Sequence, residues 1–435
     1  MKLPWRHHIS TCFVSLPILA TALSSTRHPL NISNSGARCT VLLKSASKYD
    51  GDNRILIRDM ITGMASFFGT MIDSESSRFY ALCFPPSGKR AHQHNPIRDL
   101  AAAWDASKAL RFFNERGETI PQHAHLWTAI CTTVREYETS LKTLNKNVPN
   151  SPIILDSEIL KEPVNIAHSA LMILASTCAM ELSVLLDSTM DVSSSVDGLT
   201  RGILMMQRQD GAFCVNFGQG EGDNNVYRGI EFYPGEAMVS LMHAFEKSAT
   251  LPHLLNDMTK QAIVPAMERA FGFYSAYYHH GNTDINYNIW QAQAFSKLFF
   301  AFMDKDDRSR ARAVAKFVVD LCEDVINSKS WKYELARGRS FYPNLNTVEI
   351  ACGLDALADG IHVARMAQDE RLEVLERHAS NAITFLQWIQ DQVPKDVTIG
   401  HGGLGYGGAV VLEQRLDVTG HAISALTKLD SLKCQ

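Results

Sequence analysis

An amphipathic helical pattern recurs along this 435-residue chain from about residue 55 onward, and it constrains the fold more than any other feature. It is clearest in residues 164–186, 237–245, 313–325 and 379–389. Apolar residues there stand three and four positions apart, the spacing that gathers side chains on one side of a helix. Short breaks rich in Gly, Pro and Asp separate the helical segments, and sustained β alternation is hard to find. We therefore predict an all-α protein.

Small side chains recur on the predicted apolar faces, among them Ala170, Ala237, Ala294 and Ala356. They let helices approach closely, as packed helix pairs require. A repeated helix pair buries its apolar face only against neighbours, so such repeats favour one closed domain over two independent ones. We predict that residues 50–435 form this single domain. A hydrophobic content of 46% is sufficient for a sizeable core.

Residues 1–49 differ from the rest of the chain because they contain no Asp or Glu, but they do contain Lys, Arg and many Ser and Thr. An apolar stretch over about residues 12–23 includes Ala20-Thr21-Ala22, an A-x-A pattern of the kind found at signal-peptide cleavage sites. This predicts a disordered signal-like or transit-like leader. It also predicts a protein of the secretory pathway or an organelle, or a secreted one. The alternative to a signal or transit segment is a leader that is merely disordered or non-native.

Charge and cysteine usage exclude several classes of partner. The net charge of −4 gives nucleic acid no electrostatic support as a partner. No apolar run reaches about 20 residues, so we expect no transmembrane span. The nine cysteines are scattered without a C-x-x-C pair, which favours buried free thiols over a disulfide framework or a zinc site. We expect no metal and no cofactor.

Two segments share one pattern, an apolar helix that ends in Gln, then a glycine turn, then an aromatic residue. Residues 199–213 contain Gln207, Gly211 and Phe213. Residues 382–390 end in Gln390 and are followed by the glycine-rich residues 402–406. A Gln amide can bond to the backbone groups exposed at a helix end, and glycine permits the positive φ of the turn.

These two segments resemble the QW motif of the terpenoid-cyclase and prenyltransferase toroids. The wider pattern looks like the six-hairpin glycosidase and glucuronyl C5-epimerase toroids. The resemblance covers roughly residues 58–430 as architecture, but only the two segments carry it specifically. It implies an α/α toroid, a barrel of repeated helix hairpins.

The densest polar and aromatic stretch is residues 224–236, with Tyr227, Arg228, Glu231, Tyr233 and Glu236. One interpretation is a loop at the toroid mouth. Glu231 or Glu236 would then act as a catalytic acid or base, with Tyr227, Arg228 and Tyr233 binding substrate. The alternative is helix initiation and packing, since acidic residues are common in a first helical turn.

A second cluster surrounds Asn288 and Trp290, which we select as substrate-binding candidates. An aromatic face suits the apolar side of a sugar ring, and an amide can bond to its hydroxyls; core packing and helix capping explain these residues about as well. The neighbouring pair His279-His280 could bind metal together with Asp284, but adjacent histidines are poorly placed on a shared face.

Two further clusters lie nearer the C-terminus. Asp417 and His421 are four residues apart, so on a helix a carboxylate could orient a general base there; an Asp helix start with a satisfied His is the alternative. Tyr406 lies in the glycine-rich turn before them. In the other cluster Arg337, beside Tyr342, could hold a substrate carboxylate, although a solvated loop is at least as good an explanation. The set of candidates is therefore catalytic Glu231, Glu236, Asp417 and His421 with substrate-binding Tyr227, Arg228, Tyr233, Asn288, Trp290, Arg337, Tyr342 and Tyr406.

Residues 304–307 read Asp-Lys-Asp-Asp, which matches the D-x-D-D acid motif of class II terpenoid cyclases. That role needs a desolvated carboxyl in an apolar cavity. The arginine-rich residues that follow instead indicate a solvated, charged helix start. No nucleophile elbow, zinc-peptidase motif, Walker A loop or dinucleotide fingerprint stands in a workable context.

Three functions follow from these patterns. The leading hypothesis is a carbohydrate-active enzyme, a glycoside hydrolase, lyase or uronosyl epimerase that acts on a small-molecule or oligosaccharide substrate in a central cleft. The second is a terpenoid-cyclase-like enzyme, which requires Asp306 or Asp307 to point inward. The third is a non-catalytic toroid that binds a peptide or protein.

Overall fold

The computed structural model describes residues 52–92, 95–145, 151–161, 163–217, 229–281, 284–328, 331, 347–393, 400–405 and 413–432. All of them belong to one compact unit, Ser47–Gln435. The predicted leader, residues 1–49, lies outside the described residues, so its character and the domain boundary after residue 49 stay predictions.

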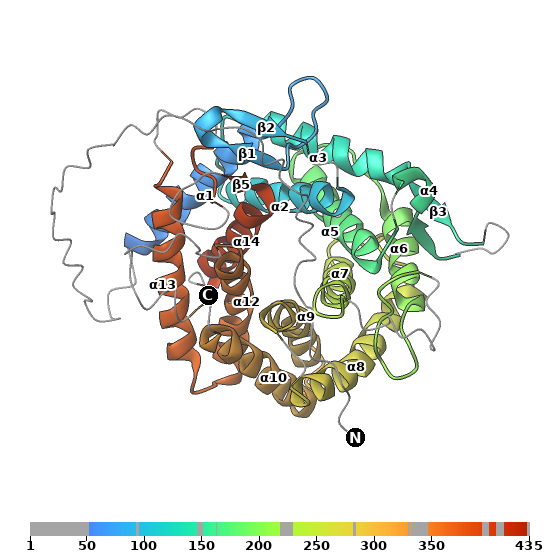
Figure 1. Ribbon diagram of the computed structural model, residues 1–435. Helices are drawn as coiled ribbons and strands as arrows, with labels where there is room; N and C mark the ends of the chain where they lie inside the picture. The colour runs from blue at the N-terminus through green and yellow to red at the C-terminus, as the bar shows by residue number, and fades with distance from the viewer. Residues whose placement is uncertain are drawn as a thin grey trace, which may run out of the picture. The chain divides into compact units, whose positions relative to one another are not determined.

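Six helices surround a common axis, and six more lie outside them (Figure 1). The inner helices are α2 (Pro96–Asn114), α5 (Ile166–Leu185), α7 (Tyr233–Lys247), α9 (Ile285–Met303), α12 (Thr347–Ala367) and α14 (Leu416–Leu432). The outer helices are α1 (Asp52–Thr70), α3 (His123–Glu138), α6 (Ser193–Met205), α8 (Asp257–His279), α10 (Arg308–Asn327) and α13 (Leu372–Gln390). Each inner helix packs against the next, and α14 packs against α2, so the inner ring is closed.

This architecture confirms the all-α prediction, and the four segments with the clearest periodicity lie in α5, α7, α10 and α13. The described strands are short. The strands β1 (Leu82–Phe84), β2 (Lys89–Ala91) and β5 (Gln414–Arg415) form an antiparallel sheet in the order β2-β1-β5, and β3 (Leu141–Thr143) pairs with β4 (Ile153–Leu155). A short helix, α4 (Ser157–Leu160), follows β4.

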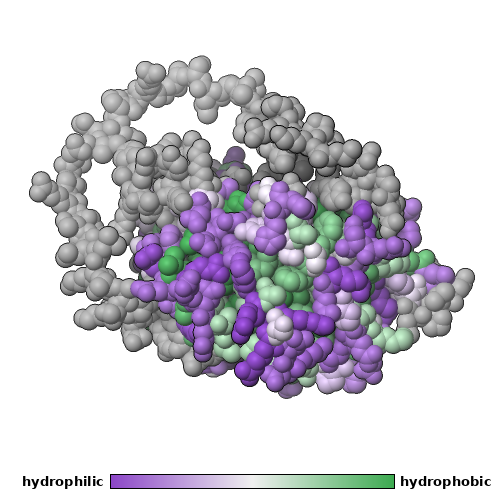
Figure 2. Space-filling model, turned by 90° about the horizontal axis from the view of Figure 1, so that it is seen from below, coloured by the Kyte–Doolittle hydropathy of each residue, from purple (hydrophilic) through white to green (hydrophobic). Residues whose placement is uncertain are grey.

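The inner and outer helices differ in how much of their surface they bury. Helix α5 is buried along almost its whole length. Among the described helices it is the one apolar and long enough to cross a membrane, although most of it lies inside the protein, as expected of a core helix. Helix α10 instead buries one face and exposes a charged one. Figure 2 shows the side of the ring where α8 and α10 lie, and hydrophilic residues cover much of it.

The two Gln–Gly segments join neighbouring outer helices, a link that the sequence analysis did not predict. After α6, the Gln207 amide donates to the carbonyl oxygens of Gly211 (3.0 Å) and of Ala266 in α8 (2.8 Å). At the end of α13, the Gln390 amide donates to Gly402 (2.8 Å) and to Met60 in α1 (3.0 Å). The second bond links the last outer helix to the first and so helps to close the outer ring.

Glycine is required at both of these turns. Gly211 has φ +96° and Gly402 has φ +87°, values that other residues rarely adopt. A Cβ atom at Gly211 would overlap the backbone of Arg269 in α8, and one at Gly402 would overlap Gly63 in α1. The turns therefore lie directly against the neighbouring outer helix.

The connections between helices differ at the two ends of the ring. Outer and inner helices alternate along the chain, so all inner helices run in the same direction. The segments before α7, α12 and α14 are long, whereas those after α9 and α12 have only four residues each, 304–307 and 368–371. The N-terminal ends of the inner helices therefore face the long connections, which is where substrates commonly bind.

Candidate active site

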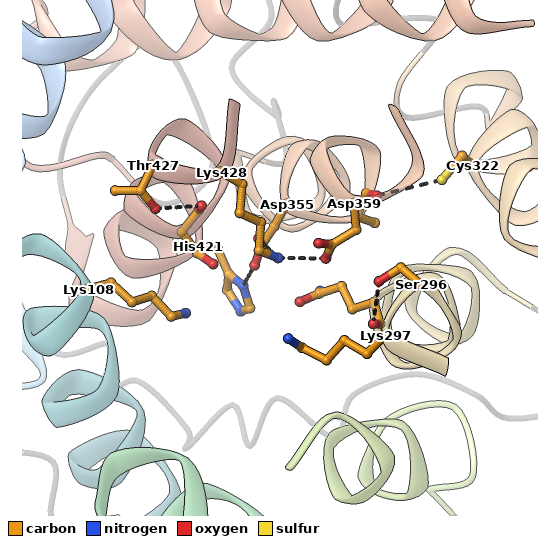
Figure 3. Close-up of polar contacts among 12 residues, drawn as sticks. Lys108, Ser296, Lys297, Cys322, Asp355, Asp359, His421, Thr427 and Lys428 are labelled. Atoms are coloured by element: carbon orange, nitrogen blue, oxygen red, sulfur yellow. Dashed lines mark hydrogen bonds and ion pairs between the residues drawn. The ribbon is translucent and has the colours of Figure 1, made fainter. Parts of the chain in front are cut away.

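A chain of charged side chains follows the inside of the ring between α12 and α14. The ring nitrogen Nδ1 of His421 lies 3.4 Å from a carboxylate oxygen of Asp355. Lys428 donates to the other oxygen of Asp355 at 2.7 Å and to Asp359 at 2.6 Å. Figure 3 shows Asp355 between His421 and Lys428, and Lys428 between the two aspartates. One carboxylate thus orients the imidazole and a lysine holds that carboxylate.

The charges in this chain stabilise one another. Burial alone would raise the pKa of Asp355, but Lys428 and the hydrogen bond with His421 outweigh it and hold the pKa below its usual range. Burial would likewise lower the pKa of His421, yet Cys352 and Asp355 raise it well above the ordinary value. The raised pKa of His421 favours the protonated ring, which Asp355 stabilises by its negative charge.

Glu236 lies in the first turn of α7, after Pro234, as the sequence predicted. Its side chain is buried, and its Oε2 atom has no hydrogen-bond partner among the described residues. Burial raises the pKa of Glu236 to about 8, although the nearby charge of His421 opposes the rise. Glu236 is therefore mainly protonated at neutral pH, as a proton-transferring carboxyl can be.

Trp290, on α9, contacts the same region. Its ring meets that of His421 edge-on, with centroids 5.7 Å apart and planes at 70°. A Cβ atom at Gly235 would overlap the Cβ of Trp290, so α7 and α9 approach closely at this point. The fold thus places Glu236, Trp290 and His421 from three inner helices near one another.

Asp417 has a different partner from the one that the sequence suggested. We expected it to orient His421, four residues later, but the carboxylate within hydrogen-bond distance of that imidazole is the one on Asp355. Asp417 instead accepts two hydrogen bonds from Arg415, one of them at 2.9 Å, and it also accepts from the backbone N–H of Val418. The pKa of Asp417 is lowered, since Arg415 outweighs the effect of burial.

The remaining candidate residues are less closely associated with His421. Glu231 lies just before α7; burial raises its pKa, and its Oε2 has no partner within the described part of the chain. Tyr233 begins α7. Asn288 is buried in α9, but it leaves the helix in a different direction from Trp290, two residues later. The candidates Tyr227, Arg228, Arg337, Tyr342 and Tyr406 lie outside the described residues.

The acid motif at residues 304–307 is not placed as a terpenoid cyclase would need it. Asp306 is 82% exposed and pairs with Arg308. Asp307 caps the N-terminus of α10 by accepting from the backbone N–H of Arg310. The structure therefore contradicts the inward placement that this alternative required, because neither group is desolvated.

A cavity of about 180 Å³ lies inside the ring between the C-terminal halves of the inner helices, a region called the C-terminal half of the inner ring below. Its lining includes Cys178 and Glu181 of α5 and His243 of α7, whose donor atoms all lie within 4.8 Å of one another. Such a donor set can bind zinc. However, the Glu181 oxygens already contact Lys247 at 2.8 Å and Arg111 at 3.4 Å, so a metal would have to compete with two cations.

Sequence analysis did not assign a site role to Asp355, Asp359 or Lys428. A signal was present, because Asp355 and Asp359 stand four residues apart within an otherwise apolar helical stretch. Charges in such a stretch are buried and must find partners. The sequence cannot say that the partner is Lys428, more than 65 residues away.

Several solved structures resemble the chain at probability 1.00. Three of them are a sugar epimerase from a ruminal bacterium (TM-score 0.55, 10% identity), an unsaturated glucuronyl hydrolase specific for heparin (0.53, 10%) and a D-mannose isomerase (0.54, 12%). The chain is an α/α toroid. The matches cover 87, 88 and 89% of this chain and 99, 99 and 100% of the respective structures.

At these identities the likeness shows the fold alone. No family model matches the chain, and no curated protein sequence matches it. The predicted fold is confirmed, and its chemistry has to be argued from the residues inside the ring.

Proposed function

We propose that the protein is a sugar-processing enzyme in which Glu236 and His421 exchange protons with the substrate. The observation that carries the proposal is the buried carboxyl of Glu236. It has an unpartnered oxygen among the described residues and lies near the imidazole of His421. A buried polar atom without a partner is costly, and a substrate hydroxyl or carbonyl would satisfy it.

Sugars are the substrate class that the neighbouring structures favour. Their names describe a sugar epimerase, a glucuronyl hydrolase and a mannose isomerase, and all of them share this toroid over most of their length. Trp290 adds an aromatic side chain beside the two proton-carrying groups. An aromatic face suits the apolar side of a sugar ring.

Isomerisation or epimerisation fits the available groups better than hydrolysis. Hydrolysis of a glycoside usually needs two carboxyl groups, one as an acid and one as a base or nucleophile. Near His421, Asp355 is bonded to Lys428 and Asp417 is bonded to Arg415. The groups left to move protons are Glu236 and His421. Glu236 in its acid form can give a proton to the substrate, and His421 in its neutral form can take one from it.

Glycoside hydrolysis is the second candidate, because Glu236 is protonated at neutral pH and could donate to a glycosidic oxygen. The pH dependence separates the two. An acid role for Glu236 predicts that kcat/KM falls above about pH 8, whereas a base role predicts that it rises toward that pH.

The direct test is incubation of the full chain with reducing sugars and with oligosaccharides in D₂O, followed by NMR. Deuterium at a sugar carbon together with a new epimer or ketose supports the leading proposal. New reducing ends without deuterium at carbon support the hydrolase instead.

The variant Glu236→Gln keeps the shape of the side chain and removes the proton, so it should abolish either activity. Asp306→Asn, on the exposed turn after α9, is the matched control and should react like the wild type. If Glu236→Gln retains full turnover, the assignment of Glu236 fails. If no sugar is changed by the wild-type chain, the function itself fails.

A further inference from the structure

Cationic side chains dominate the cavity in the C-terminal half of the inner ring. Five of them line it, against three carboxylates. The cations are Lys108, Arg111, Lys247, Lys297 and Lys428 from four inner helices. Figure 3 shows Lys108 and Lys297 reaching from different helices toward the same central space as His421.

Lys108, Lys428 and Arg111 are each more exposed than a carboxylate with which they pair. Lys108 is 17% exposed and its partner Asp105 is 5% exposed. Lys428 is 30% exposed, whereas Asp355 is fully buried. Three N–H groups are available on each lysine, so these pairs present cations to the cavity while the carboxylates lie in its wall.

The same asymmetry holds for Arg111, which is 39% exposed against 14% for Glu181. Lys247 and Lys297 are exceptions, and Lys247 is 11% exposed against 14% for Glu181. Glu246, the partner of Lys297, is 53% exposed and Lys297 only 24%, so this carboxylate lies farther toward solvent. A ligand that accepts hydrogen bonds can thus contact several ammonium groups without breaking the existing pairs.

The other groups of the lining agree with an acceptor ligand. Burial and the nearby Lys297 hold the pKa of His243 well below its ordinary value, so its ring is neutral. Burial raises the pKa of the Cys178 thiol to about 12. The Nε2 atom of Gln293 has no partner among the described residues. Neutral donors and paired ammonium groups favour a bound oxyanion over a metal ion.

We propose that this cavity binds an oxyanion and, resting on the proposed function, that the oxyanion is the carboxylate, phosphate or sulfate of an acidic sugar. The chain from Lys428 through Asp355 to His421 connects the cavity to the reacting groups, with contacts of 2.7 and 3.4 Å. The acidic group would lie deeper in the ring than the sugar atoms that exchange protons.

The first experiment is calorimetric titration of the full chain with inorganic phosphate at constant ionic strength. The wild type should bind phosphate, and Lys297→Met should weaken that binding about tenfold, the loss expected for one charged hydrogen bond. This variant should fold, because Glu246 remains solvated. Lys297→Arg should restore most of the affinity. Lys305→Met, on the exposed turn after α9, is the control and should bind like the wild type.

A second titration compares glucuronate and glucose 6-phosphate with glucose. The proposal expects the two acidic sugars to bind more tightly than glucose, and to lose that advantage in Lys297→Met. Phosphate binding without turnover of any sugar would support the oxyanion cavity while removing the proposed function. Turnover of neutral sugars with no phosphate or acidic-sugar binding would overturn the cavity proposal alone. So would stoichiometric zinc binding that Cys178→Ser abolishes.

Discussion

The polar groups inside the ring differ between the N-terminal halves and the C-terminal halves of the inner helices. In the N-terminal half, Glu236 is buried with an oxygen that no described residue contacts. In the C-terminal half, Lys108, Lys247, Lys297 and Lys428 each form an ion pair. One half therefore leaves a proton-carrying group unsatisfied, while the other compensates its charges within the protein.

This difference indicates what each half can do. An unsatisfied carboxyl can give a proton when it is neutral and take one when it is ionised, because no ion pair fixes its charge. Paired cations change their charge less readily, so they are suited to holding a ligand. Asp355 belongs to both halves, because it contacts His421 on one side and Lys428 on the other.

The largest effect is expected from Glu236→Gln. If Glu236 transfers the proton, kcat should fall by about 10²- to 10⁴-fold, the usual contribution of general acid–base catalysis. The amide cannot ionise in the unfolded chain, so at neutral pH the variant should be at least as stable as the wild type. Steady-state kinetics on the sugar identified by NMR gives the measurement. A variant that loses its fold together with its activity would instead place Glu236 among the structural residues.

Asp355→Asn should have the largest effect on stability. It leaves Lys428 with Asp359 as its remaining partner and removes the carboxylate beside His421. Breaking a buried pair costs at most about 3–5 kcal/mol. Asp359→Asn is the matched control, since it removes the other partner of Lys428 but from a site where burial already raises the carboxyl pKa. Urea denaturation of both variants should give the smaller loss for Asp359→Asn. Equal losses would mean that the two carboxylates are equivalent.

The pH dependence of stability should report on Glu236. Its pKa is about 8 in the folded protein and near 4.5 ordinarily, so the folded state keeps this proton to a higher pH than the unfolded chain does. Its contribution to the free energy of unfolding is fully present below about pH 4.5 and is lost as the pH rises through about 8. One pKa unit corresponds to about 1.4 kcal/mol. The difference between the wild type and Glu236→Gln should therefore change by a few kcal/mol across this range. A constant difference would show that Glu236 is ionised in the folded protein at neutral pH.

Asp306→Asn should have the smallest effect. Its side chain lies in solvent on the turn between α9 and α10, outside both halves of the ring interior. Removal of an exposed charge usually changes stability by less than about 0.5 kcal/mol, and turnover should be unaffected. Loss of activity in this variant would return the acid motif of residues 304–307 to consideration.

Local sequence patterns predicted much of what is local in the structure. The helical periodicity located α5, α7, α10 and α13, and Pro234 with Glu236 marked the first turn of α7. The glutamine segments also behaved as expected, because a helix end, a glycine turn and a nearby carbonyl lie within a few residues. Such features depend on neighbours along the chain.

The sequence by itself determined the helices, the glycine turns and the repeated pairs that close into a ring. Only the tertiary structure decided that His421 pairs with Asp355 rather than Asp417, and that Glu236 lies near His421. The physical reason is that periodicity specifies which face of each helix is buried, whereas the partner of a buried charge depends on the order of helices around the ring. Burial itself, which sets the pKa of Glu236, likewise exists only once the ring is closed.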